Sequence, residues 1–431
     1  MEQPKRGEFK KLEAQFNEVY LLKDPYILKT VCMTTLSQRV PGDPIWIVIV
    51  APSGGAKSEF INAVSKCTGV YPLSTLTSRT FVSGMKGGEQ KSLLKQIENG
   101  IITFKDLTSL LSEHKEERSV IMAQLREIYD GKYAKQFGTG ETVDWSGKIT
   151  VLAGSTYAIH SLKQQYTAMG ERFLFYNMIQ PDRKEAARKT MENQASGTMG
   201  ARRIGLQDSM AYYMNETIII PDQMPRINPE LEEKVLDLAE LATRARSDVE
   251  RNYHSPQQEI IAVHPPEMPT RFAGQLQGCI RSLMILNWNE TGDLVLFDGD
   301  KIIVYKLALD SITMSRRIVM QELSRYDALN TAGLAVKLNL PTNTVRRWLE
   351  DLVALEIADR KRGTGSKGDM WNIKQKYRDI ICEFEGIETL HAELIEENIV
   401  ENDHGNDDPA VIPDELKKVA NGEINVEDLG L

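Results

Sequence analysis

Cysteine is scarce in this 431-residue chain, and its four cysteines are widely separated: Cys32, Cys67, Cys279 and Cys382. Such spacing gives neither a disulfide framework nor a zinc cluster, so we expect a protein of the reducing cytoplasm. None of the six histidines has the spacing of metal ligands, and His264 is followed directly by two prolines. The sequence therefore predicts no metal site built on cysteine or histidine.

Long apolar runs are also missing from the sequence. No stretch approaches the roughly 18 apolar residues of a membrane-spanning helix, and residues 1–6 do not resemble a signal peptide. The net charge is −9, but residues 388–431 hold 13 acidic residues against two lysines, so residues 1–387 carry about +2. The body of the chain is thus compatible with a polyanionic partner such as DNA, and no membrane partner is expected.

The strongest functional signal lies in residues 44–64. Residues 45–50 are apolar and mostly β-branched, which is typical of a strand buried on both faces of a parallel sheet. A glycine-rich loop and then a segment of helical spacing follow this strand. A strand, a loop and a helix in that order form a phosphate cradle. We expect it to bind ATP through Ser53, Gly54, Gly55, Ala56, Lys57 and Ser58.

In such a cradle the Lys57 ammonium reaches the β- and γ-phosphates and the Ser58 hydroxyl helps to hold Mg²⁺. Ala51 and Ala56 replace the outer glycines of the pattern G-x-x-x-x-G-K-[ST]. The alternative is a strand–turn–helix that ends in Lys-Ser by coincidence.

Further strands and helices predict an α/β fold with a parallel sheet flanked by helices. The predicted strands are 70–74, 101–104, 149–153 and 173–176, and the predicted helices are 8–22, 25–40, 90–98, 117–129 and much of 181–260. Lys105-Asp106 follows the strand 101–104, where an acid would bind Mg²⁺ and help to activate water. The alternative for Asp106 is a solvated acid at the end of a strand.

Two regions predict contact with DNA. Residues 131–147 alternate on either side of Gly-Thr-Gly as a hairpin does, and Lys132 and Lys135 beside aromatic residues would grip a phosphate backbone. From residue 313, helices at 316–323, 331–338 and 342–355 precede a β pair around a basic glycine-rich loop, a pattern that resembles a winged helix. The residues expected to face phosphate there are Arg346, Arg347, Arg362 and Lys367. The alternatives are an exposed lysine-bearing edge for the hairpin and a winged helix that packs only against protein.

This order of elements resembles an AAA+ ATPase, and within that class the MCM-type helicase branch, over about residues 44–290. The phosphate loop, the hairpin before the strand that ends in Ser155, and the motifs Glu171-Arg172-Phe173 and Pro269-Thr270-Arg271 carry the resemblance. It implies a homo-oligomeric ring, expected to be a hexamer, in which Arg172 acts in trans as an arginine finger and Arg271 acts in cis as sensor 2. The chain is also similar to uncharacterised ATPases of phages and mobile elements.

The sequence departs from the family pattern at the catalytic acids. One carboxylate of the family's Asp-Glu pair is missing at Lys105-Asp106-Leu107, unless Glu113, Glu116 or Glu117 folds back. The sensor-1 asparagine is also replaced, by Ser155 or Thr156, whose hydroxyl would orient water less firmly. ATP binding is therefore better supported than fast hydrolysis.

The two arginines also have structural alternatives. Arg172 could form a salt bridge with Glu171 or another acid, and Arg271 could be an ordinary helix-surface residue.

We expect five regions: an N-terminal helical segment (1–43), an AAA+ core (44–180), a helical lid with sensor 2 (181–312), a winged helix (313–376) and an acidic, largely disordered tail (377–431). The expected function is that of an ATP-dependent DNA helicase, translocase or remodeller in the replication of a phage or mobile element. The alternative is an ATP-binding, DNA-bound switch, such as a helicase loader or regulator, with little hydrolysis. The tail would either solubilise the protein or bind a replication protein.

Overall fold

The computed structural model describes residues 5–82, 92–107, 110, 114–138, 140, 142–160, 172–252, 254–255, 258–363 and 368–386. These residues form two compact units. Unit 1 takes its described residues from 1–162, 172–228 and 274–304, and unit 2 takes them from 229–273 and 305–386. Each unit is therefore assembled from segments that are far apart in the sequence.

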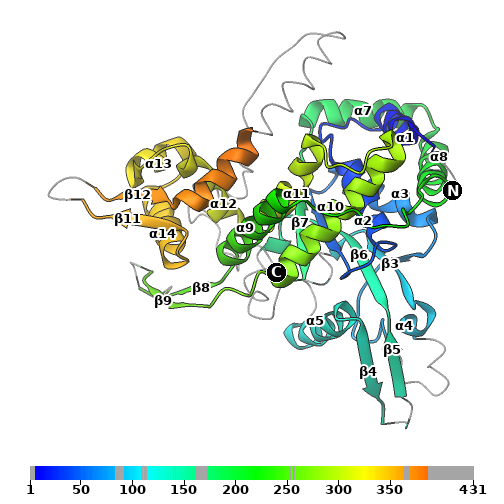
Figure 1. Cartoon of the computed structure of the whole chain (residues 1–431), viewed down its shortest axis with the longest axis horizontal. Helices are drawn as coiled ribbons and strands as arrows, with labels where there is room; N and C mark the ends of the chain where they lie inside the picture. Colours follow the sequence, from blue (N-terminus) through cyan, green and yellow to red (C-terminus); the bar gives the residue numbers. More distant parts are fainter. Residues whose placement is uncertain are drawn as a thin grey trace. The chain divides into compact units, whose positions relative to one another are not determined.

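Unit 1 is built around a five-stranded parallel sheet (Figure 1). Its strands are β1 (Trp46–Val50), β2 (Val70–Leu73), β3 (Asn99–Phe104), β6 (Lys148–Ser155) and β7 (Phe173–Asn177), in the order β2-β3-β6-β1-β7. Every residue of β1 is buried, because this strand has neighbours on both edges and helices on both faces. The predicted α/β class and the predicted core strands are thus confirmed.

Helices flank the sheet of unit 1. They are α1 (Glu8–Val19), α2 (Ile27–Ser37), α3 (Lys57–Ala63), α4 (Leu93–Gln96), α5 (Lys115–Tyr129), α7 (Arg183–Ala195) and α8 (Met199–Tyr212), the last extended by the π-turn η5 (Tyr213–Thr217). Phe16 of α1 stacks on Phe60 of α3 with ring centroids 5.7 Å apart. The N-terminal helix therefore packs directly on the helix that follows the phosphate loop.

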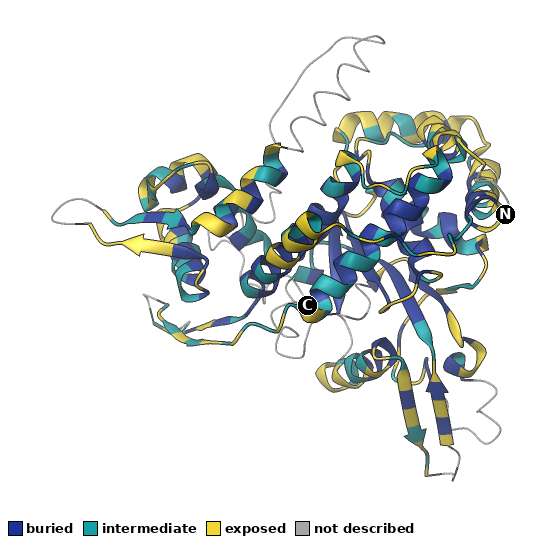
Figure 2. Ribbon diagram, in the orientation of Figure 1, coloured by how far each residue is buried: buried dark blue, intermediate teal, exposed yellow. Residues whose placement is uncertain are grey.

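A two-stranded hairpin extends from the sheet between α5 and β6 (Figure 1). It consists of β4 (Lys132–Gln136) and β5 (Thr142–Ser146), as the sequence predicts. Tyr133 pairs with Trp145 across the hairpin, both side chains are buried, and the Trp145 indole donates to the Ile97 carbonyl at 2.7 Å. One face of the hairpin thus packs against the rest of unit 1, while much of the other face is exposed (Figure 2).

Unit 2 contains a small hairpin where the sequence predicted helix and irregular chain. After α9 (Pro229–Ala245), strands β8 (Val249–Arg251) and β9 (Ile260–Val263) pair antiparallel. The helical prediction for residues 181–260 is therefore wrong at residues 218–228, between η5 and α9, and again beyond residue 245. The reason is that the apolar helical spacing of α9 stops there, whereas residues 260–263 are mostly β-branched and favour a strand.

Two longer helices, α10 (Thr270–Thr291) and α11 (Asp298–Asp310), precede the C-terminal module of unit 2 in the sequence. A boundary between the two units falls within each of these helices. The module comprises α12 (Met314–Ser324), β10 (Leu329–Asn330), α13 (Thr331–Leu338), α14 (Thr342–Ala354), β11 (Ala358–Lys361) and β12 (Met370–Ile373). The three strands form one sheet in the order β10-β12-β11. Leu349 and Leu352 of α14 are fully buried and belong to the core of this module.

The predicted tail begins too early. Residues 375–386 form a helix in which Tyr377, Ile381 and Phe384 are buried, and Phe384 stacks on Tyr305 with ring centroids 5.8 Å apart. Their i, i+4 and i+7 spacing gives the helix an apolar face that packs within unit 2. Among the residues that the structure describes, no helix is both long and apolar enough to cross a membrane.

Candidate functional site

The loop between β1 and α3 contains two residues in left-handed backbone conformation. Gly54 has φ +80° and Ala56 has φ +59°, an angle that residues other than glycine seldom adopt. The Gly55 amide donates to the Pro52 carbonyl at 3.0 Å, which closes the turn. Left-handed residues among right-handed ones turn successive N–H groups to one side and form an anion-binding concavity. The backbone of this loop therefore fits a phosphate group.

Lys57, the first residue of α3, is only 6% exposed although its side chain carries a charge. Its Nζ atom lies 3.5 Å from the Pro52 carbonyl oxygen, so the side chain folds back over the loop. An ammonium group has three donors, and this long contact uses one of them. Ser58 is half-buried in the first turn of the same helix. Lys57 and Ser58 thus lie where ligands to a phosphate and its Mg²⁺ would be needed.

The carboxyl ends of the parallel strands bring Ser155 and Asp106 to the edge of the sheet that carries this loop. Ser155 ends β6, is fully buried and pairs with Val50, and its carbonyl accepts a hydrogen bond from the Ala51 amide at 3.1 Å. Phe104 ends β3 beside Ala153, so the exposed Asp106 follows at the same edge. This edge is where open α/β sheets bind ligands.

The structure does not bring a second carboxylate beside Asp106 from the described residues that the sequence suggested. The residue after Asp106 is a leucine, and the described glutamates nearby are exposed on α5 or bonded to another group. Leu107 is buried, and Glu117 accepts a hydrogen bond from the Ser78 amide at 2.9 Å, a contact that lowers the pKa of this carboxyl. Glu116 is exposed in the first turn of α5, and Glu113 lies outside the described residues. Among these described residues, Asp106 is therefore the acid best placed to bind a Mg²⁺ ion at the phosphate loop.

The residues that follow β7 pack against the loop between β1 and α3. A Cβ atom on Gly55 would lie 2.6 Å from Gln180 Oε1, so the two residues are in close contact. The carboxylate of Asp24, which is 1% exposed, fixes this segment by accepting from Tyr176 Oη at 2.7 Å and from the Ile179 amide at 2.9 Å. Burial and the neighbouring carboxylate raise the pKa of Tyr176.

Asp24 lies close to the start of α2, but the N-cap position of this helix is occupied by Tyr26. The Tyr26 amide donates to Asp24 at 3.1 Å, so the carboxylate joins the N-terminal segment to β7. Sequence reasoning missed this role, since the strand partner lies about 150 residues away.

Arg172 lies at the end of the sheet where the parallel strands begin, whereas the loop lies at the end where they finish. It precedes Phe173, which pairs with Trp46 at the start of β1, whereas the loop follows Val50. Four strand residues, about 13 Å, separate the two levels. The Arg172 side chain is 9% exposed, pairs with Asp130 at 2.9 Å, and lies over the Tyr129 ring, 5.4 Å from its centroid. Of the predicted alternatives, the salt bridge to a nearby acid is therefore present.

Arg271 lies in the first turn of α10 and contacts Glu267 at 3.6 Å. Glu267 also pairs with Arg246, whose guanidinium is buried 4.7 Å from the centroid of the Phe272 ring. The charge of Arg246 is therefore paired inside unit 2.

The predicted DNA residues of the β4–β5 hairpin differ in their surroundings. Lys132 is exposed, and Lys135 is half-buried with its Nζ atom 5.1 Å from the centroid of the Phe137 ring. Tyr133 is only 6% exposed, and burial raises its pKa. This buried ring cannot stack on a base, and the exposed charged residues of the described hairpin are Lys132 and Asp144.

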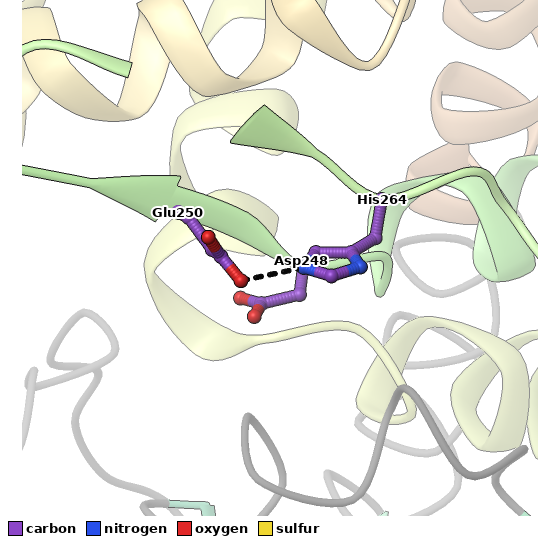
Figure 3. Close-up of side chains that lie close together, drawn as sticks. All are labelled: Asp248, Glu250 and His264. Atoms are coloured by element: carbon purple, nitrogen blue, oxygen red, sulfur yellow. Dashed lines mark hydrogen bonds and ion pairs between the residues drawn. The ribbon is translucent and has the colours of Figure 1, made fainter. Parts of the chain in front are cut away.

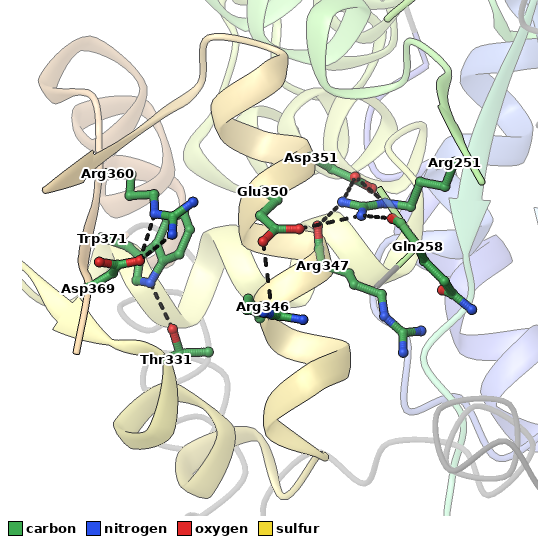
Figure 4. A network of polar contacts seen from close by, with 10 residues as sticks. All are labelled: Arg251, Gln258, Thr331, Arg346, Arg347, Glu350, Asp351, Arg360, Asp369 and Trp371. Atoms are coloured by element: carbon green, nitrogen blue, oxygen red, sulfur yellow. Dashed lines mark hydrogen bonds and ion pairs between the residues drawn. The ribbon is translucent and has the colours of Figure 1, made fainter. Parts of the chain in front are cut away.

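In the C-terminal module, Arg346 and Arg362 are exposed, Arg347 is half-buried, and Lys367 lies outside the described residues. Arg346 lies 3.9 Å from Glu350 in the next turn of α14 (Figure 4). The exposed N-terminal part of α14 thus carries a cation that is weakly engaged within the chain.

A buried network that sequence reasoning missed fastens α14 to β8 (Figure 4). Arg251 donates to Asp351 at 2.6 Å and 3.0 Å and to the Arg347 carbonyl at 2.7 Å. Arg316 approaches the same carboxylate at 3.6 Å. Burial raises the pKa of Asp351, an effect that the two guanidinium groups oppose. The C-terminal half of α14 is therefore a packed surface.

The β11–β12 hairpin of the module is held by Asp369. Its carboxylate accepts from Arg360 Nε at 2.7 Å and from the Gly363 amide at 3.1 Å, and both contacts lower its pKa (Figure 4). Arg360 also lies 5.0 Å from the centroid of the Trp371 ring. Arg360 is exposed, but its guanidinium is engaged by Asp369 and Trp371 within the hairpin, and Arg362 is a second exposed arginine there.

The β8–β9 hairpin gathers Asp248, Glu250 and His264, although histidine spacing predicted no such group (Figure 3). One possible ligand atom from each residue lies within 4.8 Å of the others. His264 Nε2 and Glu250 Oε1 are 2.8 Å apart, which raises the pKa of His264. In the structure, Glu250 thus engages His264 Nε2 directly, within the hairpin.

No known family model matches this chain, and a comparison with curated proteins finds no similar protein. Function must therefore be inferred from the residues and the geometry described above.

Proposed function

We propose that this chain is an AAA+-type ATPase that acts on DNA as an oligomeric ring, with the activity of a helicase, translocase or remodeller. The observation that carries the proposal is the phosphate-shaped loop with the buried Lys57, at the sheet edge that also holds Ser155 and Asp106. Because β6 lies between β1 and β3, Ser155 stands between the phosphate loop and the acid. A terminal phosphate in the cradle would face all three elements.

In this proposal each residue has a separate task. Lys57 binds the β- and γ-phosphates of ATP, and Ser58 and Asp106 hold Mg²⁺, which when bound neutralises the charge of the phosphates. Ser155 orients the attacking water. Arg172 cannot reach a phosphate bound by its own loop, since it lies at the opposite sheet edge. We therefore assign it to the ATP of a neighbouring copy, where a guanidinium stabilises developing charge.

Two features support DNA as the partner. The order of helices and strands in the C-terminal module, with β12 between β10 and β11, supports a winged helix. Its exposed Arg346 and Arg362, together with Lys132 on the β4–β5 hairpin, would contact phosphates. Such contacts make binding strongly dependent on salt concentration.

One observation favours a second candidate, an ATP-binding and DNA-bound switch that hydrolyses ATP slowly. Asp106 is followed by the buried Leu107, and Glu117 is committed to the Ser78 amide. A site with one acid can bind ATP and Mg²⁺ but activates water poorly. A helicase loader or regulator needs no more than that.

Steady-state ATP hydrolysis with and without single-stranded DNA distinguishes the two. A motor predicts DNA-stimulated turnover that is lost in Asp106→Ala and Arg172→Ala, together with loss of ATP binding in Lys57→Ala. A switch predicts tight ATP binding with negligible turnover. Retained ATP binding by Lys57→Ala would refute both, and Lys105→Ala serves as the control because it changes an exposed neighbour at the same edge.

A further inference from the structure

The Arg172 side chain connects the start of β7 with the base of the β4–β5 hairpin. Asp130, its partner, lies in the turn between α5 and β4, and the next residue, Gly131, has φ +77°. The Gly147 amide donates to the Gly131 carbonyl at 3.1 Å and closes the base of the hairpin. The carboxylate that binds Arg172 is thus two residues from the exposed Lys132.

The backbone of Arg172 is fixed independently of its side chain. Its carbonyl accepts a hydrogen bond from Gln275 Nε2 at 2.7 Å, and the next residue, Phe173, pairs with Trp46 in the sheet. Only the side chain is therefore able to change partners. A guanidinium offers five donors on a long flexible stem, and it binds a phosphate or a carboxylate in the same way.

The two members of the pair differ in exposure. The Arg172 side chain is 9% exposed, whereas the Asp130 side chain is 55% exposed. Solvent therefore reaches the acid, and a negatively charged group of another molecule would compete with Asp130 for the guanidinium at this side. While the pair is intact, the arginine is held inside its own chain.

We propose that Asp130 is a positioning residue that keeps Arg172 in a resting state, and that the ATP of a second copy of this chain displaces it. The inference rests on the proposed function, because it requires Arg172 to act in trans. When the guanidinium leaves Asp130 for the γ-phosphate, the base of the β4–β5 hairpin loses a charged contact. Occupancy of one subunit's ATP site would thereby loosen the hairpin of its neighbour.

The test compares the wild type with Asp130→Asn, which keeps the shape of the side chain and removes its charge. Because less competition holds the arginine, ATP turnover at equal protein concentration should rise at least threefold. Trypsin cleavage after Lys132 should be accelerated by a non-hydrolysable ATP analogue in the wild type, and should already be fast without it in Asp130→Asn. Asp144→Asn, which changes another exposed acid of the hairpin, should alter neither readout.

A charge reversal separates this role from a purely structural salt bridge. The double variant Asp130→Arg/Arg172→Asp should recover the thermal stability that either single reversal loses, yet remain without ATP turnover. Turnover in Asp130→Asn that equals or falls below that of the wild type, with ATP binding unchanged, would overturn the inference alone. Failure of the wild type to bind ATP would instead remove the proposed function and this inference with it.

Discussion

Replacement of Asp24 by alanine offers the sharpest test of how the phosphate loop is supported. The buried carboxylate accepts hydrogen bonds from Tyr176 Oη, the Ile179 amide and the Tyr26 amide. In Asp24→Ala all three donors lose their acceptor, and each unsatisfied buried donor costs about 1–3 kcal/mol. Since part of the cost is offset by removing a buried charge, we expect a loss of about 3–5 kcal/mol in the free energy of unfolding.

Thermal unfolding of the full chain measures this loss, and a decrease of about 10 °C in Tm is expected for a unit of this size. Tyr176→Phe removes one donor and should cost about 1–2 kcal/mol. The double variant should cost less than the sum of the two single changes, because the residues share one hydrogen bond. Asp43→Ala removes an exposed acid that precedes β1 and should change stability by less than about 0.5 kcal/mol.

Asp24→Ala should also weaken ATP binding at least threefold, measured by calorimetry below the Tm of the variant. The reason is that Ile179 positions the segment whose Gln180 side chain lies against Gly55. A cost below about 1 kcal/mol would show that the three contacts do not act together as described. Normal ATP affinity with the full stability loss would show that other contacts hold the segment of Ile179 and Gln180 against the loop.

Three further outcomes are expected elsewhere in the chain. Arg251→Met should cost about 2–4 kcal/mol in urea unfolding because it leaves the buried Asp351 poorly paired, and an additional Asp351→Leu change should recover most of that loss; no recovery would contradict the assignment. Trp145→Phe should cost about 1–2 kcal/mol, since it leaves a buried carbonyl without its donor, and should spare ATP binding. His264 should titrate above its ordinary pKa of 6.5 by NMR and return toward that value in Glu250→Gln. The stabilising contribution of the pair is present below pH 6.5 and lost as pH rises through the raised pKa, so an unshifted histidine in the wild type would refute it.

The parallel sheet could be predicted because its strands carry their own signal. Residues 101–104 and 173–176 are mostly apolar, and Ile45 to Val50 is followed by loop residues that cannot continue a strand. The hairpin at 131–147 was also predictable, since alternation on either side of Gly-Thr-Gly fixes both its strands and its turn. Local pattern was sufficient at these positions.

Other parts depend on contacts that no local pattern contains. Two of the three partners of Asp24 lie 152 and 155 residues away in the sequence, so its role follows from the assembled fold. Asp248 and His264 lie close together because β8 pairs with β9. The sequence did not predict this pairing, because the apolar spacing of the preceding helix α9 is a much stronger signal. At Arg172 the family resemblance suggested a role, but the ion pair with the half-exposed Asp130 could be found only from the structure.

The position of β1 inside the sheet, between β6 and β7, has a consequence for synthesis of the chain. Trp46 pairs with Val151 on one side and with Phe173 on the other, so both neighbours of this strand are made more than 100 residues later. At 5–20 residues per second, translation needs roughly 6 to 25 s to span the 127 residues between Trp46 and Phe173. Until β6 is made, this apolar and mostly β-branched strand has neither of its edges paired, and until β7 is made one edge stays open. Such segments aggregate readily. Slow synthesis or high expression should therefore favour inclusion bodies, whereas a chaperone that shields residues 45–50 should increase the yield of folded protein.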